Sequence, residues 1–226
     1  MPMPTTQSLK VSVPHTGDVS ALLMTPENAT ACYVFAHGAG AGMAHSFMAA
    51  FVAELAQRGI ATLRYQFPFM ESGSKRPDSP AVAQATVRAA VAEARRRLPE
   101  LPLLAGGKSF GGRMTSQAQA ASPLESVRGL VFVGFPLHPA GKPGVDRAAH
   151  LTTVQCPMLF LQGSRDALAD LGLLREALAP LGERATLSVF DDTDHAFHVR
   201  ARSGTTDAAT LIALADAVAE WVASLG

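Results

Sequence analysis

Residues 101–112 read LPLLAGGKSFGG, and this stretch decides the fold. An apolar run ends in paired glycines, and the residues after Ser109 continue at helical spacing as far as Ala121. Residues 107–111 therefore have the pattern G-x-S-x-G between a strand and a helix. Gly107 and Gly111 would let the two elements approach closely, while a strained turn holds the serine hydroxyl clear of the backbone.

The rest of the chain repeats this alternation of strand and helix. Short runs rich in β-branched and apolar residues predict strands at 9–13, 19–24, 32–36, 61–65, 102–105, 129–133, 158–162 and 186–190. Longer stretches at helical period predict helices at 45–58, 80–98, 109–121, 169–181 and 206–225. The expected fold class is α/β, with a mostly parallel central sheet of about eight strands and helices on both faces. The first two strands, joined by the turn around His15, Thr16 and Gly17, should form an antiparallel edge.

Composition limits the partners that the protein can have. The 226 residues are 48% hydrophobic and 17% charged, which is enough for one packed domain over residues 1–226. Nineteen basic residues balance nineteen acidic ones, so we expect no nucleic-acid or membrane partner. The first 14 residues resemble no targeting segment and no apolar run reaches membrane-spanning length, so we expect a cytoplasmic protein. Cys32 and Cys156 are interpreted as reduced core residues.

Two nucleotide-binding hypotheses can be set aside. Residues 107–109 resemble the end of a P-loop, but that motif needs a glycine where this chain has Pro102. Gly38, Gly40 and Gly42 miss the dinucleotide fingerprint, because its third glycine would fall at Met43. We expect no cofactor and no metal.

A serine hydroxyl needs a base to become a nucleophile. Of the seven histidines, His195 has the most suitable position, in a loop after the strand at 186–190 and before the last helix. Such a loop emerges at the carboxyl edge of the sheet, where open α/β sheets build their sites. His198 is the alternative, although it already begins to leave the loop.

The base in turn needs a carboxylate to orient it. Asp166 follows the strand at 158–162 by four residues and would lie at the same edge. Asp170 is the alternative, but it is better placed to cap the helix that follows. Asp191, Asp192 and Asp194 could orient a histidine locally, but acidic runs of this kind are usually solvated.

The loop after the strand at 32–36 could stabilise an oxyanion. It reads HGAGAGM from His37 to Met43, and its small residues would let backbone N–H groups approach a substrate. We assign one donor to the N–H of Ala39 and the other to that of Phe110, with Gly38 and Gly40 supporting the loop. His37 is expected to anchor it by a hydrogen bond. The candidates for substrate contact are apolar residues of neighbouring loops: Phe67, Phe69, Phe135 and Leu137.

Together these residues resemble the α/β-hydrolase superfamily over nearly the whole chain, in residues 37–40, 107–112, 163–166 and 194–197. The small size resembles the dienelactone-hydrolase-like group. In dienelactone hydrolases proper the nucleophile is a cysteine, and Ser109 at this position favours ester or thioester hydrolysis instead. The resemblance implies an acyl-transfer hydrolase with Ser109 as nucleophile, His195 as base and Asp166 as orienting acid. The alternative is a weakly active or inactive binding protein with the same fold.

Many members of this superfamily carry a long helical lid after the strand that corresponds to residues 129–133. Here residues 134–157 are rich in proline and glycine at their start and have room for at most a short helix. We therefore expect a minimal lid and small, soluble ester substrates. The sequence fixes neither the natural substrate nor the oligomeric state.

Overall fold

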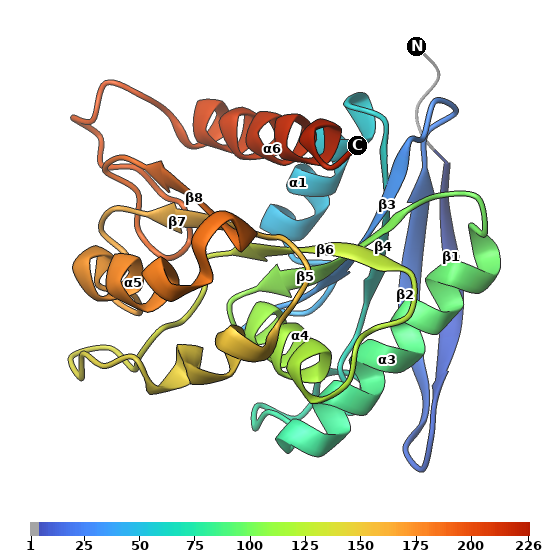
Figure 1. The fold of residues 1–226 in the computed structure, drawn as a ribbon. Helices are drawn as coiled ribbons and strands as arrows, with labels where there is room; N and C mark the ends of the chain where they lie inside the picture. The colour runs from blue at the N-terminus through green and yellow to red at the C-terminus, as the bar shows by residue number, and fades with distance from the viewer. Residues whose placement is uncertain (1–4) are drawn as a thin grey trace.

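The computed structural model describes residues 5–226, and its centre is one eight-stranded sheet (Figure 1). The strands lie side by side in the order β1-β2-β4-β3-β5-β6-β7-β8. Their bounds are β1 Thr5–Val13, β2 Gly17–Thr25, β3 Ala31–Ala36, β4 Ile60–Tyr65, β5 Leu103–Lys108, β6 Val127–Val133, β7 Met158–Gly163 and β8 Ala185–Phe190. The sheet thus contains all eight strands that the sequence predicts.

The sheet is antiparallel at one edge and parallel elsewhere. β1 pairs antiparallel with β2, and β2 pairs antiparallel with β4. All the remaining pairs are parallel. β3, β4 and β7 are buried along their whole length. Strands covered on both faces carry mostly apolar side chains, which explains why these three stand out in the sequence as largely apolar runs.

Helices cover both faces of the sheet (Figure 1). α1 Ser46–Gln57 and α6 Asp207–Ser224 pack together over one face, around a core that includes Phe35, Phe51 and Val131. α3 Pro80–Arg97, α4 Phe110–Ala121 and α5 Leu171–Leu178 cover the other face. α3 begins at Pro80, and proline is favourable at the first position of a helix.

Three short elements differ from the sequence prediction. Within the predicted loop 67–79, one helical turn forms, α2 Pro68–Glu71, stabilised where Phe69 N–H donates to Asp78 Oδ2 at 3.1 Å. The predicted helix 169–181 begins later, because Asp170 is its N-cap and accepts from Leu173 N–H at 3.0 Å. It then continues as a 3₁₀ helix, η2 Ala179–Arg184.

The connection after β6 contains no large cover. Between Val133 and Met158 the only helix is the 3₁₀ helix η1 Asp146–Thr153, which agrees with the minimal lid that the sequence predicts. In the part of the chain that the structure describes, no helix is both long and apolar enough to span a bilayer. Both cysteines are free thiols; Cys32 is buried and Cys156 is partly buried.

Candidate active site

Ser109 lies in the turn between β5 and α4. Its backbone has φ 50° and ψ −113°, a conformation that non-glycine residues rarely adopt and that indicates local strain. Its backbone N–H donates to Val133 O at 3.2 Å, which ties the turn to the end of β6. Ser109 is the N-cap residue of α4, but its hydroxyl makes no capping hydrogen bond. The hydroxyl is therefore not committed to the helix.

The two glycines of the motif are required by close packing against β3. A Cβ on Gly107 would lie 2.6 Å from Ala36 O, and one on Gly111 would lie 2.6 Å from both Ala36 Cβ and His37 O. Such distances are too short for any side chain. The glycines thus hold the Ser109 turn against the loop that begins at His37.

Asp166 and His195 form a hydrogen-bonded pair at the carboxyl edge of the sheet. His195 Nδ1 lies 2.6 Å from Asp166 Oδ2, and the Asp166 carboxylate is fully buried. Because an ionised carboxylate only accepts, the Nδ1 proton lies between them and Nε2 is left as an acceptor. Asp166 Oδ1 also accepts from Leu168 N–H at 2.7 Å. The carboxylate is thus fixed in one orientation.

Gln162 supports this pair, and the sequence analysis did not single it out. It is buried on β7; its Nε2 donates to Asp166 Oδ2 at 2.5 Å and its Oε1 accepts from Phe135 N–H at 3.0 Å. The signal was visible as the one polar side chain in the run MLFLQ. A buried amide needs partners, and the partner of this one is the candidate acid.

Lys108 supports His195 from the other side, and its role was also missed. Its Nζ donates to His195 O and lies 5.1 Å and 5.7 Å from the ring centroids of Phe197 and Phe47. Burial lowers the pKa of Lys108 to about 8, although Asp166 and Asp194 oppose the shift. Its ammonium group therefore holds the backbone of the candidate base from within the protein.

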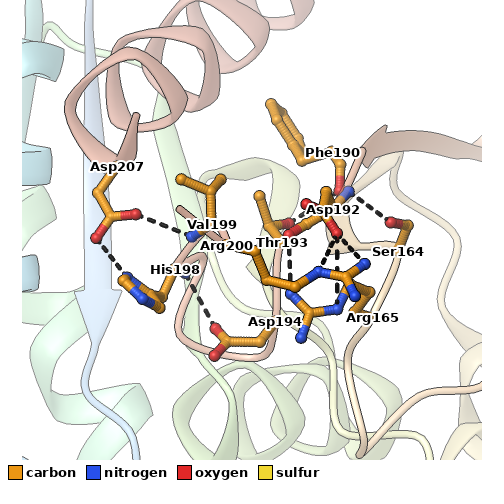
Figure 2. Close-up of polar contacts among 10 residues, drawn as sticks. All are labelled: Ser164, Arg165, Phe190, Asp192, Thr193, Asp194, His198, Val199, Arg200 and Asp207. Carbon is orange, nitrogen blue, oxygen red and sulfur yellow. Dashed lines mark hydrogen bonds and ion pairs between the residues drawn. The ribbon is translucent and has the colours of Figure 1, made fainter. Parts of the chain in front are cut away.

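Figure 2 shows how the loop between β8 and α6, which carries His195, is held in shape. Asp194 Oδ1 accepts from the N–H groups of Ala196, at 2.8 Å, and His198, at 3.0 Å. Asp192 pairs with Arg200, and its backbone N–H donates to Ser164 Oγ at 2.8 Å. These two carboxylates are structural, rather than the solvated groups that the sequence suggests.

The loops that carry Asp166 and His195 are joined directly. Arg165 N–H donates to Thr193 O at 2.9 Å, and Ser164 N–H donates to Phe190 O at 3.0 Å. Each candidate thus lies within two residues of a hydrogen bond between the two loops. This arrangement fixes the acid relative to the base before a substrate binds.

The alternatives to His195 and Asp166 both form hydrogen bonds elsewhere in the structure. His198 is exposed, and its Nδ1 lies 2.6 Å from Asp207 Oδ2, a contact that raises the pKa of His198 (Figure 2). Asp170 caps α5, as described above, and its backbone N–H donates to His138 Nε2 at 2.9 Å. Neither is hydrogen-bonded to Asp166 or His195.

The candidate oxyanion loop lies directly over the Ser109 turn. A Cβ on Gly38 would be 3.7 Å from Ser109 Cβ, which is ordinary van der Waals contact. His37 is buried; its Nδ1 donates to Gly38 O at 2.7 Å and its Nε2 accepts from Phe67 N–H at 3.0 Å. Burial lowers the pKa of His37, consistent with a neutral ring that anchors the loop.

The two backbone donors assigned from the sequence are unpaired. Among the hydrogen bonds of residues 5–226, none uses the N–H of Ala39 or that of Phe110. Phe110 begins α4, where the first N–H groups have no acceptor within the helix. Both N–H groups are thus free to bind an oxyanion. Gly40, the last residue assigned to this loop, is exposed.

The four residues expected to contact a substrate are buried instead. Phe67, Phe69, Phe135 and Leu137 all belong to the core beneath α3, α4 and α5. Phe67 and Phe69 pack against Phe110, and Phe135 packs against Phe132 and Phe160. A substrate could reach them only by displacing the groups that cover them, so we do not include them in the proposed site.

One contact of a complete triad is not formed. Among the hydrogen bonds of the described residues, none joins Ser109 Oγ to His195 Nε2. The two residues are nevertheless neighbours of the same short segment, because Ser109 N–H bonds Val133 O and a Cβ on the next residue, Gly134, would lie 3.4 Å from the His195 ring. In free enzymes such catalytic contacts are often long. Within residues 5–226, no three His, Cys, Asp or Glu side chains are arranged to hold a metal ion.

Comparison with known proteins shows the family and the fold of the chain. A family model described as an alpha/beta hydrolase domain matches residues 29–223, so the chain belongs to the alpha/beta hydrolase family. Its fold is similar to that of a dienelactone hydrolase from Anabaena variabilis, with 23% identity, a TM-score of 0.76 and 99% of each chain covered.

Two further solved structures have the same fold. One is a serine hydrolase without a lid from Xanthomonas campestris, with 24% identity, a TM-score of 0.73, and 98% of this chain and 96% of that chain covered. The other is an esterase domain from Rhodothermus marinus, with 15% identity, a TM-score of 0.74, and 98% of this chain and 100% of that chain covered. These three structures show that the chain shares its fold with small, single-domain hydrolases.

Proposed function

We propose that this protein is a serine hydrolase that cleaves small esters or thioesters through an acyl-enzyme intermediate. The observation that carries the proposal is the buried Asp166–His195 hydrogen bond at the edge of the sheet where Ser109 occupies a strained turn. Membership in the alpha/beta hydrolase family supports a hydrolase. The choice of an ester as substrate rests on the serine nucleophile and the open site.

In the first half-reaction, Ser109 Oγ attacks the acyl carbonyl carbon while His195 Nε2 takes the hydroxyl proton. The carbonyl oxygen becomes an oxyanion and receives hydrogen bonds from the N–H groups of Ala39 and Phe110. When the carbonyl re-forms, the bond to the alcohol or thiol breaks, and His195 returns its proton to that leaving group. The acyl group is then bound to Ser109.

In the second half-reaction, water takes the place of the alcohol. His195 removes a proton from the water as its oxygen attacks the acyl carbon, and the same proton returns to Ser109 Oγ when the acid leaves. Asp166 keeps Nε2 in its acceptor state and stabilises the imidazolium that forms in each step. Gln162 and Lys108 act through these two residues, by fixing the carboxylate and the His195 backbone respectively.

The proposal is tested with a fluorophosphonate probe and a chromogenic ester such as p-nitrophenyl acetate. The wild-type protein should be labelled at Ser109 and should release p-nitrophenol. Ser109→Ala should lose the labelling and about four to six orders of magnitude in turnover, with an unchanged circular dichroism spectrum. Ser122→Ala is a matched control, since this exposed serine lies at the far end of α4. Absence of labelling in the folded wild-type protein would instead support the inactive binding protein.

A further inference from the structure

Two arginines, Arg113 and Arg147, have no acidic partner within residues 5–226. Arg113 is one turn into α4, and its backbone N–H donates to Ser109 O at 3.1 Å. Arg147 belongs to η1, the 3₁₀ helix between β6 and β7, which packs against α4. Both side chains are partly buried.

Ser116 and His150 connect the two elements at this point. Ser116 Oγ donates to Arg113 O at 2.9 Å and lies 2.8 Å from His150 Nε2. A 3₁₀ helix has three residues per turn, so Arg147 lies on the same face of η1 as His150, three residues later. The side chain of Arg147 is therefore on the side of η1 that faces Arg113.

The charges of the cluster agree with this placement. Burial, and then the like charge of Arg147, lowers the pKa of Arg113. Burial, and then the charge of Arg113, lowers the pKa of His150 to about 4. His150 is thus neutral at pH 7, and it donates from Nε2, because the Ser116 proton is already used on Arg113 O. The cluster carries two positive charges and contributes no negative one.

Neither guanidinium group has a hydrogen bond or an ion pair within residues 5–226. By contrast, the guanidinium groups of Arg58, Arg97 and Arg200 each form an ion pair with a carboxylate. Two like charges in a partly desolvated place repel each other unless an anion lies between them. The planar, two-pronged guanidinium group matches the geometry of carboxylate and phosphate.

We propose that Arg113 and Arg147 form a subsite for an anionic group, a carboxylate or a phosphate, of the ester substrate. This inference rests on the proposed function, because the ester bond of the same molecule would lie at Ser109. Because Arg113 N–H donates to Ser109 O at 3.1 Å, the subsite lies one helical turn from the candidate nucleophile. The predicted substrate is a short ester with a negative charge a few bonds from its carbonyl carbon.

The kinetic test compares two esters that differ in one charge, mono-4-nitrophenyl succinate and its methyl ester. The wild-type protein should prefer the charged ester in kcat/KM by roughly ten- to a hundredfold at low salt, the range expected for hydrogen bonds to charged groups. Arg113→Gln and Arg147→Gln should each lower the ratio of the two kcat/KM values, and high salt should lower it as well. Using a ratio cancels any general loss of catalysis. Arg128→Gln, an exposed arginine at the amino end of β6, should keep the wild-type ratio.

Thermal melts check that the variants are folded. Arg113→Lys is a second variant, which keeps the positive charge but loses the planar guanidinium group. It should retain part of the preference for the charged ester. A wild-type ratio near one, or a ratio that survives both glutamine substitutions, would overturn the subsite and leave the proposed hydrolase intact.

A binding measurement separates failure of the subsite from failure of the hydrolase. Succinate and inorganic phosphate are titrated into Ser109→Ala protein by calorimetry, with and without Arg113→Gln. Binding that is lost with Arg113→Gln supports the subsite even if neither ester is cleaved, and the tighter of the two anions identifies the preferred group. Equal binding, or no binding of either anion, in both proteins would refute it.

Discussion

Replacement of Lys108 by methionine should remove a specific pH dependence of stability. The folded protein lowers the pKa of Lys108 from 10.5 to about 8, mainly through burial. Between these two values the unfolded chain holds the proton and the folded chain has released it. Stability therefore rises with pH across this window, since the unfolded state binds more protons. Below about pH 8 both states carry the charge, and the folded protein bears the full cost of burying it.

The size of the effect follows from the pKa change. At about 1.36 kcal/mol per pKa unit, the rise from pH 8 to pH 9.5 is roughly 2 kcal/mol, and the full effect by pH 10.5 is about 3 kcal/mol. Other buried groups act in the opposite direction, because burial raises the pKa values of Cys32, Cys156 and Tyr33. These groups are the same in both proteins and cancel in the difference.

The assay is urea unfolding of the wild type, Lys108→Met and the exposed control Lys142→Met at several pH values from 7 to 9.5. The free energy of unfolding of wild type minus that of Lys108→Met should increase with pH. The same difference for Lys142→Met should stay flat. Equal pH slopes for wild type and Lys108→Met would refute the buried, destabilised charge.

The same substitution should slow catalysis. Without Nζ, the His195 carbonyl loses its donor and the base is held less firmly. We expect kcat to fall about tenfold, equivalent to about 1.4 kcal/mol, with little change in KM. A proportional rise in KM with unchanged kcat would show that Lys108 acts on substrate binding instead.

Three other outcomes are expected. Asp166→Asn should lower turnover by about 10³- to 10⁴-fold, because it disturbs the His195 tautomer, while Asp170→Asn should leave turnover and urea unfolding nearly unchanged, because the asparagine oxygen can still cap α5; the reverse order would move the acid to Asp170. His195→Ala should abolish ester hydrolysis and His198→Ala should leave most of it, since His198 bonds Asp207 outside the pair; similar losses in both would contradict the choice of base. In a series of p-nitrophenyl esters, rates should be highest for short acyl chains and show no jump at the solubility limit; a steady rise toward long chains would reveal an apolar pocket.

The central strands of the sheet could be predicted because they are buried on both faces. Their apolar runs, such as residues 158–162, leave little ambiguity, and the structure extends most of them by only one or two residues. The missed turn α2 had one local signal, Pro68 at its first position, which the surrounding prolines and glycines obscured. Asp78, whose carboxylate stabilises that turn, lies outside it, so a local pattern could not reveal the contact.

The residues that support the candidate site were harder to predict than the candidate catalytic residues themselves. A motif specifies Ser109 and a topological position suggests Asp166 and His195, but Gln162 and Lys108 act through contacts between distant segments. Lys108 occupies the unspecified second position of G-x-S-x-G, so the pattern gives it no role. The aromatic residues predicted to contact substrate lie in the core, and the sequence shows that they are apolar but not whether they face a pocket or the core.

This burial has a consequence for specificity. Phe67, Phe69, Phe135 and Leu137 lie in the core and η1 is a short helix between β6 and β7, so none of them offers a surface that could hold an acyl chain. Each methylene adds about 0.8 kcal/mol only if it is buried, so chain length can contribute little to binding here. A charged group does not need such a surface, because two guanidinium groups can hold it through charge-assisted hydrogen bonds. The absence of a cover and the unpaired Arg113–Arg147 cluster thus point to the same substrate class, short esters recognised by their charge.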